Sequence, residues 1–291
     1  MKKTYAILAL SLKLFFLIKV QSLSNIILGI QSITESLPIS SGAHVVLFSA
    51  FFGDVQLNIL QKIMMNLIPL LAFICFFWKD CFNVLKNFLY IFFFQKKINK
   101  TSDEIVYLRS LIIATFAFGI FWLLSFIIPL SFLNILKKNS SIIAINSIVF
   151  GFLLLFIDRW KMLEQDGKIT EKKAFFVGLT QIFALFMPGV SRMGVCITVL
   201  RFLGINRKES LKFSCLLAIP ISLVSIAFDT LNLINYNEEI YFKFEPLIFI
   251  LFSIFSFLIL YALNKYIKNH SFFIFGLYRI ILGGLILFLI K

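Results

Sequence analysis

Charged residues are scarce in this chain of 291 residues. Asp, Glu, Lys and Arg together make up only 14% of it, whereas 60% of the residues are hydrophobic and 38 are phenylalanine. The mean hydropathy of +0.97 lies outside the range of soluble globular domains. The composition excludes an ordinary soluble domain and predicts a polytopic membrane protein of the all-α class.

Histidine and paired cysteine are also lacking. With only His44 and His270, the chain cannot build a metal site from several histidines, so any metal is expected to have oxygen ligands. The four cysteines form no CxxC or other paired pattern, which argues against a disulfide scaffold.

Six apolar stretches are long enough to cross a bilayer, which requires about 20 residues in a helix. They cover residues 57–78, 111–130, 142–157, 211–234, 246–263 and 271–290. Two further stretches, 25–52 and 174–203, are interrupted by Pro38 and by Pro188-Gly189, which break helical hydrogen bonding. Broken backbone at membrane depth must be buried or line a wet cavity. We therefore expect six transmembrane helices plus two re-entrant helical hairpins within one domain, residues 25–291.

Residues 1–24 precede this domain and have a basic start and an apolar core, as a signal peptide does. Lys13 and Lys19 interrupt that core and the cleavage pattern is poor. The sequence favours an uncleaved amphipathic or anchoring helix.

The formal net charge of +14 has a topological explanation. Basic residues occupy short breaks between apolar runs rather than one face, so no nucleic acid partner is expected. Segment 79–109 carries six basic residues and segment 159–173 carries five, which predicts that both are cytoplasmic. The acidic segment 235–245 is predicted to be external. In this topology the tips of the two hairpins meet in a cavity that is open to the outside.

Two polar islands lie at the breaks of the two hairpins. The first, residues 29–44, contains Gln31, Glu35, Pro38, Ser40, Ser41 and His44. The second, residues 181–198, contains Gln181, Pro188, Gly189, Ser191 and Arg192. Glutamine, proline and serine recur in both at the same spacing, with an offset of about 150 residues. This indicates a diverged inverted repeat.

The islands together suit phosphoryl chemistry. Arg192 can hold phosphate oxygens with its planar guanidinium, and Ser191 and the backbone near Gly189 can add donors. Glu35, with Gln31 one helical turn earlier, can hold a hard divalent cation or orient a water.

Ser41 and His44 have two roles each that the sequence does not separate. Ser41 can be a nucleophile or a phosphate ligand, and His44 can transfer protons or attack phosphorus. Structural roles also stay open, because Arg192 can simply neutralise Glu35 and Ser40 can bond a neighbouring carbonyl.

The two islands resemble the signature regions of the undecaprenyl pyrophosphate phosphatase family, the BacA-type bacitracin-resistance proteins. The first resembles an (E/Q)xxxE run followed by FLPxSSTGH, here Gln31, Glu35, Leu37, Pro38, Ser40, Ser41 and His44. The second resembles QxxALxPGxSRSG, here Gln181, Ala184, Leu185, Pro188, Gly189, Ser191 and Arg192. The similarity extends from about residue 25 to the carboxyl terminus.

The resemblance implies a phosphatase in the bacterial inner membrane, with its site facing the periplasm. It would remove the terminal phosphate of undecaprenyl diphosphate, recycle the lipid carrier of peptidoglycan synthesis and confer bacitracin resistance. By the same resemblance, a divalent cation such as Mg²⁺ or Ca²⁺ would be required. Glu35 and Gln31 would position the metal or water, Ser41 and His44 would act in attack and proton transfer, and Ser191 with Arg192 would bind the diphosphate. We also count Arg192 among the catalytic residues, since it can neutralise charge in the transition state, and Ser40 and Gly189 among the substrate-binding candidates.

This chain also departs from the family pattern. Gln31 stands where Glu is frequent, and Met193 and Cys196 replace a serine and a threonine. At Gln31 a metal would be held by a neutral amide and therefore more weakly. The changes can also weaken contacts with phosphate or signal lost activity. The alternative function is a polyprenyl-phosphate flippase or secondary transporter, because inverted repeats with broken helices occur there too. A homodimer is an open option for the oligomeric state.

Overall fold

The computed structural model describes residues 23–53, 57–94, 103–129, 135–136, 139–159, 167–235 and 246–289. Every regular element within these ranges is helical, which confirms the all-α class. The longer helices are Leu23–Thr34, α2 (Ser41–Phe52), α3 (Ile59–Phe76), α4 (Trp78–Phe94), α5 (Asp103–Leu124), α7 (Ser140–Arg159), α8 (Glu171–Phe186), α9 (Arg192–Phe202), α10 (Arg207–Asn235), α11 (Pro246–Tyr266) and α12 (Phe273–Leu289). A short 3₁₀ turn, η1 (Ser125–Ile127), extends α5.

Five of the helices are long and apolar enough to cross a membrane, namely α3, α5 with η1, α7, α10 and α11. They coincide with five of the six predicted spans. The sixth predicted span contains α12, an apolar helix of 17 residues. The expectation of a polytopic helical membrane protein is therefore confirmed.

Both interrupted stretches form a helix, a break and a second helix. The Leu23–Thr34 helix and α2 make up the first hairpin, and α8 and α9 make up the second. The breaks at residues 35–40 and 187–191 contain Pro38 and Pro188, from which the breaks were predicted. The predicted stretches 25–52 and 174–203 thus each contain two helices and a break, and their ends lie within three residues of the observed helix ends.

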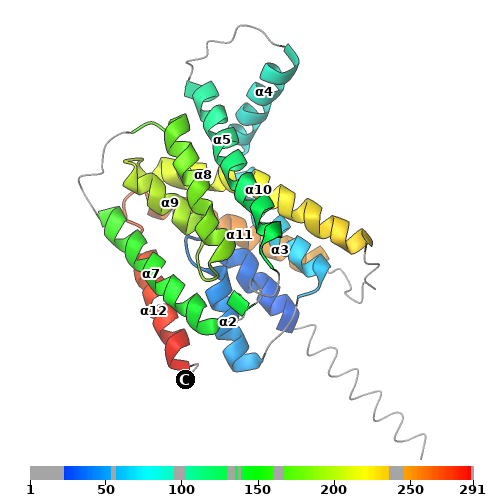
Figure 1. Cartoon of the computed structure of the whole chain (residues 1–291), viewed down its shortest axis with the longest axis vertical. Coiled ribbons are helices and arrows are strands. Elements are labelled where there is room, and N and C mark those ends of the chain that lie inside the picture. The colour runs from blue at the N-terminus through cyan, green and yellow to red at the C-terminus, as the bar shows by residue number, and fades with distance from the viewer. Residues whose placement is uncertain are drawn as a thin grey trace, which may run out of the picture.

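The segment 79–109, which we interpreted as a basic loop, is helical over most of its described length. It contains α4 and the start of α5, and Figure 1 shows these two helices projecting together from the body of the protein. The cause is local: Phe82, Leu85, Phe88 and Leu89 recur at helical spacing between the lysines. The residues 1–22 of the predicted anchoring helix and most of the acidic segment lie outside the described residues.

Helices α7 and α12 run side by side, as Figure 1 shows, because small residues line their contact. A Cβ added at Gly276 would lie 2.7 Å from the carbonyl oxygen of Gly151, and one at Gly283 would lie 2.6 Å from that of Ala144. This close contact matters for the site because both helices carry side chains that support the second hairpin.

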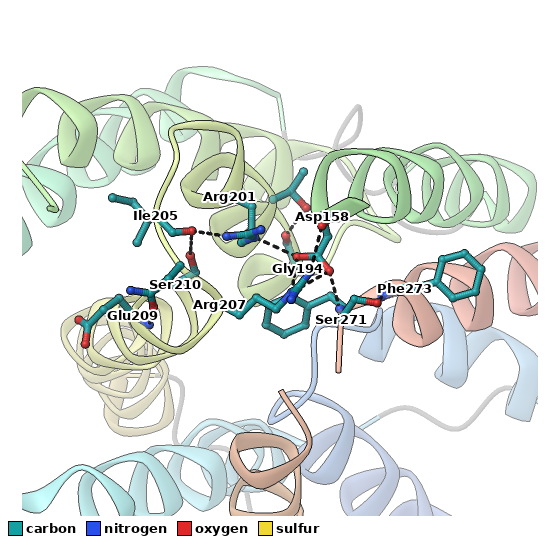
Figure 2. Close-up of polar contacts among 12 residues, drawn as sticks. Asp158, Gly194, Arg201, Ile205, Arg207, Glu209, Ser210, Ser271 and Phe273 are labelled. Atoms are coloured by element: carbon teal, nitrogen blue, oxygen red, sulfur yellow. Dashed lines mark hydrogen bonds and ion pairs between the residues drawn. The ribbon is translucent and has the colours of Figure 1, made fainter. Parts of the chain in front are cut away.

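A buried carboxylate joins the ends of four helices. Asp158, at the end of α7, accepts hydrogen bonds from Arg201 Nε (2.9 Å), Arg207 Nε (3.0 Å) and the backbone N–H of Phe272 (2.7 Å). Figure 2 shows both guanidinium groups directed at Asp158, with Arg201 also donating to the carbonyl of Ile205. Because both carboxylate oxygens of Asp158 accept hydrogen bonds, this cluster is a structural ion network.

Candidate active site

The two polar islands meet at Glu35, directly after the Leu23–Thr34 helix. Its Oε1 accepts hydrogen bonds from Arg192 Nη2 (2.6 Å) and Arg192 Nε (3.2 Å). Its Oε2 accepts a hydrogen bond from Ser41 Oγ at 2.9 Å. The Glu35 and Arg192 side chains are 25% and 28% exposed. The pair is therefore sheltered, yet still accessible to a ligand.

The local sequence explains why Ser41 and Arg192 occupy these places. Ser40 and Ser191 are N-caps: their hydroxyl oxygens accept the backbone N–H of Ala43 (3.2 Å) and Gly194 (3.1 Å). The residue after each cap begins a helix, so Ser41 starts α2 and Arg192 starts α9. Both helix N-termini thus adjoin Glu35, and their dipoles favour a bound anion.

These caps correct the register of the repeat. The sequence spacing matched Ser41 with Ser191, whereas the structure matches Ser40 with Ser191 and Ser41 with Arg192, an offset of 151 residues. The reason is one additional residue between the proline and the cap in the second hairpin. Ser40 and Ser191, both predicted to bind substrate, are buried and shape the two breaks.

His44 lies one turn into α2 and contacts a residue that the sequence did not assign. Its Nδ1 is 2.6 Å from the carbonyl oxygen of Ser40, and its Nε2 is 2.7 Å from the hydroxyl of Tyr278 on α12. A carbonyl only accepts, so Nδ1 carries a proton, and in neutral His44 the Nε2 accepts from Tyr278. Tyr278 lies within the part of the chain that resembles the family, but it carried no predicted role.

Gln31 has an amide oxygen well placed for a cation. It lies one helical turn before Glu35, whose backbone N–H donates to the Gln31 carbonyl at 2.9 Å. The Gln31 Oε1 atom is buried and has no hydrogen-bond partner in the part of the chain that the structure describes. The same part contains no group of three or more His, Cys, Asp or Glu side chains suited to a metal. A cation here would rely on Glu35, Gln31 and oxygens of the substrate.

Helices α7 and α12 hold the break of the second hairpin. Gly189 has φ of +89°, and a Cβ there would lie 2.3 Å from the carbonyl oxygen of Ile143. Asn146 Nδ2 donates to the carbonyl of Pro188 at 2.8 Å, and Arg279 Nη2 donates to that of Gly189 at 3.2 Å. The predicted backbone donor near Gly189 therefore belongs to a strictly fixed turn.

Arg279, within the apolar helix α12, is fully buried. Among the described residues neither its Nε nor its Nη1 has a hydrogen-bond partner. Its contact with Gly189 gives it a position behind the second hairpin. The signal was visible in the sequence as an arginine within an apolar run, which commonly marks function.

Comparison with known proteins agrees with this arrangement. The sequence model of the family described as bacitracin resistance protein BacA matches residues 25–285, which include both hairpins and α12. The chain belongs to the BacA family. Its Glu35, Ser41 and Arg192, brought together by two separate hairpins, all lie within the matched residues.

Several curated BacA relatives cover nearly the whole chain. A protein named undecaprenyl-diphosphatase from Caldicellulosiruptor bescii is 32% identical over 265 residues, which are 90% of this chain and 95% of that protein. Proteins of the same name from Leptospira interrogans and Campylobacter curvus are 31% and 28% identical, each over at least 89% of this chain and 95% of their own length.

Two departures from the BacA pattern lie away from the site. Met193 and Cys196 on α9 are 6% and 2% exposed and belong to the main hydrophobic core. Their side chains pack against other apolar residues. This placement argues against an effect of Met193 and Cys196 on contacts with phosphate. Gln31, the third departure, does lie at the site.

Proposed function

We propose that this chain is an integral membrane phosphatase that converts undecaprenyl diphosphate into undecaprenyl phosphate and inorganic phosphate. The observation that carries the proposal is Glu35, bonded at once by Ser41 and Arg192, at the N-termini of two helices from different halves of the chain. Its BacA relatives are named for this activity. Recycling of the lipid carrier and bacitracin resistance would follow from it.

Arg192 would bind the diphosphate. Two of its N–H groups donate hydrogen bonds to Glu35, and the remaining guanidinium N–H groups can donate to phosphate oxygens. The N-termini of α2 and α9 add partial positive charge at the same place. Together they would stabilise the charge on the phosphoryl oxygens in the transition state.

Ser41 is the nucleophile that the contacts favour. Its hydroxyl already donates to Glu35, which is the arrangement of a nucleophile and its general base. Glu35 would take the proton as Ser41 Oγ attacks the terminal phosphorus and the anhydride bond breaks, which releases undecaprenyl phosphate. Water would then hydrolyse the phosphoserine. Both ring nitrogens of His44 are hydrogen-bonded, to the Ser40 carbonyl and to the Tyr278 hydroxyl. His44 would exchange a proton with Tyr278 and so supply or accept protons during the reaction.

The cation that we propose is Mg²⁺ or Ca²⁺, because carboxylate and amide oxygens suit hard divalent ions. Glu35 and the buried amide oxygen of Gln31, which has no hydrogen-bond partner among the described residues, would hold the cation together with oxygens of the substrate. Such a cation neutralises phosphate charge. A neutral amide in place of a second carboxylate would make protein contacts with the metal weaker than in relatives with Glu.

The setting we propose is the bacterial inner membrane, with the site facing the periplasm. The five candidate spans and the family support a multi-pass membrane protein. The prediction that the site opens to the periplasm rests on the charge of the loops. The homodimer stays a prediction from sequence.

Phosphate release from undecaprenyl diphosphate by the detergent-purified protein, with Mg²⁺ or Ca²⁺, tests the function. Glu35→Ala, His44→Ala and Arg192→Ala should each abolish most of the release, at least about a hundredfold for the two charged residues. Glu104→Ala and Arg109→Ala are charge-matched controls near the start of α5, outside the candidate site, and should keep activity. A folded wild-type protein that releases no phosphate, but moves the lipid across vesicles, would establish the flippase instead.

A further inference from the structure

Helix α4 lies beside the ends of candidate spans instead of crossing between them. It directly follows α3 in the chain and precedes α5. Asp80, in its first turn, pairs with Lys212 in the second turn of α10 at 3.6 Å. Asn87 Nδ2 donates to Glu104 in the first turn of α5 at 3.3 Å. These contacts hold α4 level with the ends of two spans, and in Figure 1 it runs across the direction of α7 and α10.

One face of α4 is turned toward the body of the protein. Cys81 and Val84 pack against the main hydrophobic core, between the contacts made by Asp80 and Asn87. With 3.6 residues per turn, these four residues lie on the same side of the helix. The rotation of α4 about its own axis is therefore fixed, and so are the faces that it presents outward.

An apolar stripe lies on the outward side of α4. It consists of Trp78, Phe82, Leu85 and Leu89, which follow one another at the three- and four-residue spacing of a single helical face. Their exposed fractions are 59%, 62%, 55% and 40%. Large apolar side chains that are exposed together mark a surface for a partner or a membrane.

A polar edge runs along this stripe. Lys79, Asn83, Lys86 and Tyr90 each come directly after a stripe residue, so they lie about 100° around the helix axis from it. Lys79 and Lys86 are exposed, and neither forms an ion pair with a described residue. The ammonium group of Lys79 lies 5.5 Å from the ring centroid of Trp78, which brings cationic and apolar groups together.

We infer that α4 is an interfacial helix that binds anionic phospholipids of the cytoplasmic leaflet. Its apolar stripe enters the acyl-chain region, and Lys79 and Lys86 bind lipid phosphate groups at the level of the head groups. Trp78 has the position that tryptophan favours at a membrane surface. The leaflet follows from the six basic residues of segment 79–109, which predict a cytoplasmic location. This surface is separate from Glu35 and does not depend on the proposed phosphatase activity.

The charge of the polar edge selects the class of lipid. Asp80 is the one acidic residue in the sequence of α4, and its pairing with Lys212 on the body face keeps it from offsetting the exposed lysines. A lysine close to an anionic membrane surface raises affinity by about fivefold. Zwitterionic head groups offer no such gain, so Lys79 and Lys86 favour a lipid such as phosphatidylglycerol.

Quenching of Trp78 by brominated lipids tests the inference. In full-length protein with Trp122→Phe and Trp160→Phe, Trp78 is the only tryptophan. The bilayer is phosphatidylcholine with a fraction of brominated phosphatidylglycerol or of brominated phosphatidylcholine. We expect both brominated lipids to quench Trp78, with at least about fivefold higher apparent affinity for phosphatidylglycerol. High salt should lower that ratio. Lys79→Gln with Lys86→Gln should bring it to about one.

Lys265→Gln with Lys268→Gln is the matched control. Both lysines are exposed at the end of α11 and in the turn after it, so the pair removes the same charge away from α4. The control should keep the ratio at Trp78, and an unchanged melting temperature shows that each variant is folded. Absence of quenching by either lipid would place α4 in water and overturn the inference. Equal affinity for both lipids in the parent protein, or equal losses in the two double variants, would also overturn it.

Discussion

Single residues carry the chemistry, and Glu35 is the residue on which most contacts converge. Each of its carboxylate oxygens is bonded by the first residue of a different helix, Ser41 of α2 and Arg192 of α9. The open question from sequence was whether Arg192 only neutralises Glu35. The partial exposure of both side chains leaves them accessible, so the ion pair and a role in binding phosphate are compatible.

Gln31 offers a test of the cation at this scale. Gln31→Glu places a second carboxylate one turn from Glu35, and ligand charge raises affinity for a hard cation. We expect the Ca²⁺ or Mg²⁺ concentration that half-saturates the rise in melting temperature to fall by roughly tenfold. Asn66→Asp on α3 adds the same charge elsewhere and should leave that midpoint unchanged. An equal change in both variants would argue against a cation at Gln31.

The sequence predicted which residues form the site better than what each one does. Polar side chains in an apolar chain are conspicuous, so Glu35, Ser41 and Arg192 were identifiable. The capping roles of Ser40 and Ser191 depend on where a helix starts, which shifts by one residue between the hairpins. Contacts of His44 with Tyr278 join residues 234 positions apart, and no local pattern reports them.

Among the elements, the breaks in the two hairpins decide where the helix N-termini lie. The second break has the stricter geometry, because Gly189 adopts a positive φ against the backbone of α7. Any side chain at that position meets the carbonyl of Ile143. The position of Arg192 beside Glu35 therefore depends on a glycine that takes no part in the chemistry.

Gly189→Ala should consequently destabilise the protein and reduce activity together. We expect a loss of at least about 2 kcal/mol in unfolding free energy, from the strained φ and the contact with Ile143. Gly284→Ala on α12 is the control, because a Cβ there meets nothing within 4 Å and alanine favours helix. Thermal unfolding in detergent measures both. A melting temperature for Gly189→Ala equal to that of Gly284→Ala would contradict the strain.

Helix positions were largely predictable from sequence, because long apolar runs and prolines define them. The exception was α4, where attention to lysine charge concealed apolar residues at helical spacing. Both signals were present in the same 17 residues. Loop charge reports the side of the membrane, whereas apolar periodicity reports the secondary structure, and the two have to be analysed separately.

For the whole molecule, the Asp158 cluster connects α7, α9, α10 and α12 at one end of the protein. Asp158→Asn would leave Arg201 and Arg207 without their anion, and we expect a loss of about 3–5 kcal/mol in stability. Asp103→Asn removes a pair whose side chains are 76% and 78% exposed, and should cost less than about 1 kcal/mol. Chemical denaturation of the two variants measures both losses in the free energy of unfolding. Similar losses would show that burial of the ion pair does not determine its contribution to stability.

The assembly of the helices could be anticipated only in outline. Matching islands indicated that two halves of the chain meet, which the contact of Glu35 with Arg192 confirms. Which helices lie side by side depends on small residues such as Gly151 and Gly276 that have equivalents throughout the chain. A single sequence does not distinguish a glycine at a helix contact from one that faces lipid.

The distance in sequence between Glu35 and Arg192 has a consequence for how the protein is made. The two residues are separated by 157 positions, so the ribosome completes the first hairpin well before the guanidinium exists. During that interval Glu35 lies in an apolar segment without its cation, a state in which a carboxyl group stays neutral or hydrated. The second half of the chain thus serves as a folding partner for the first, because Glu35 gains its guanidinium partner only when the late hairpin docks.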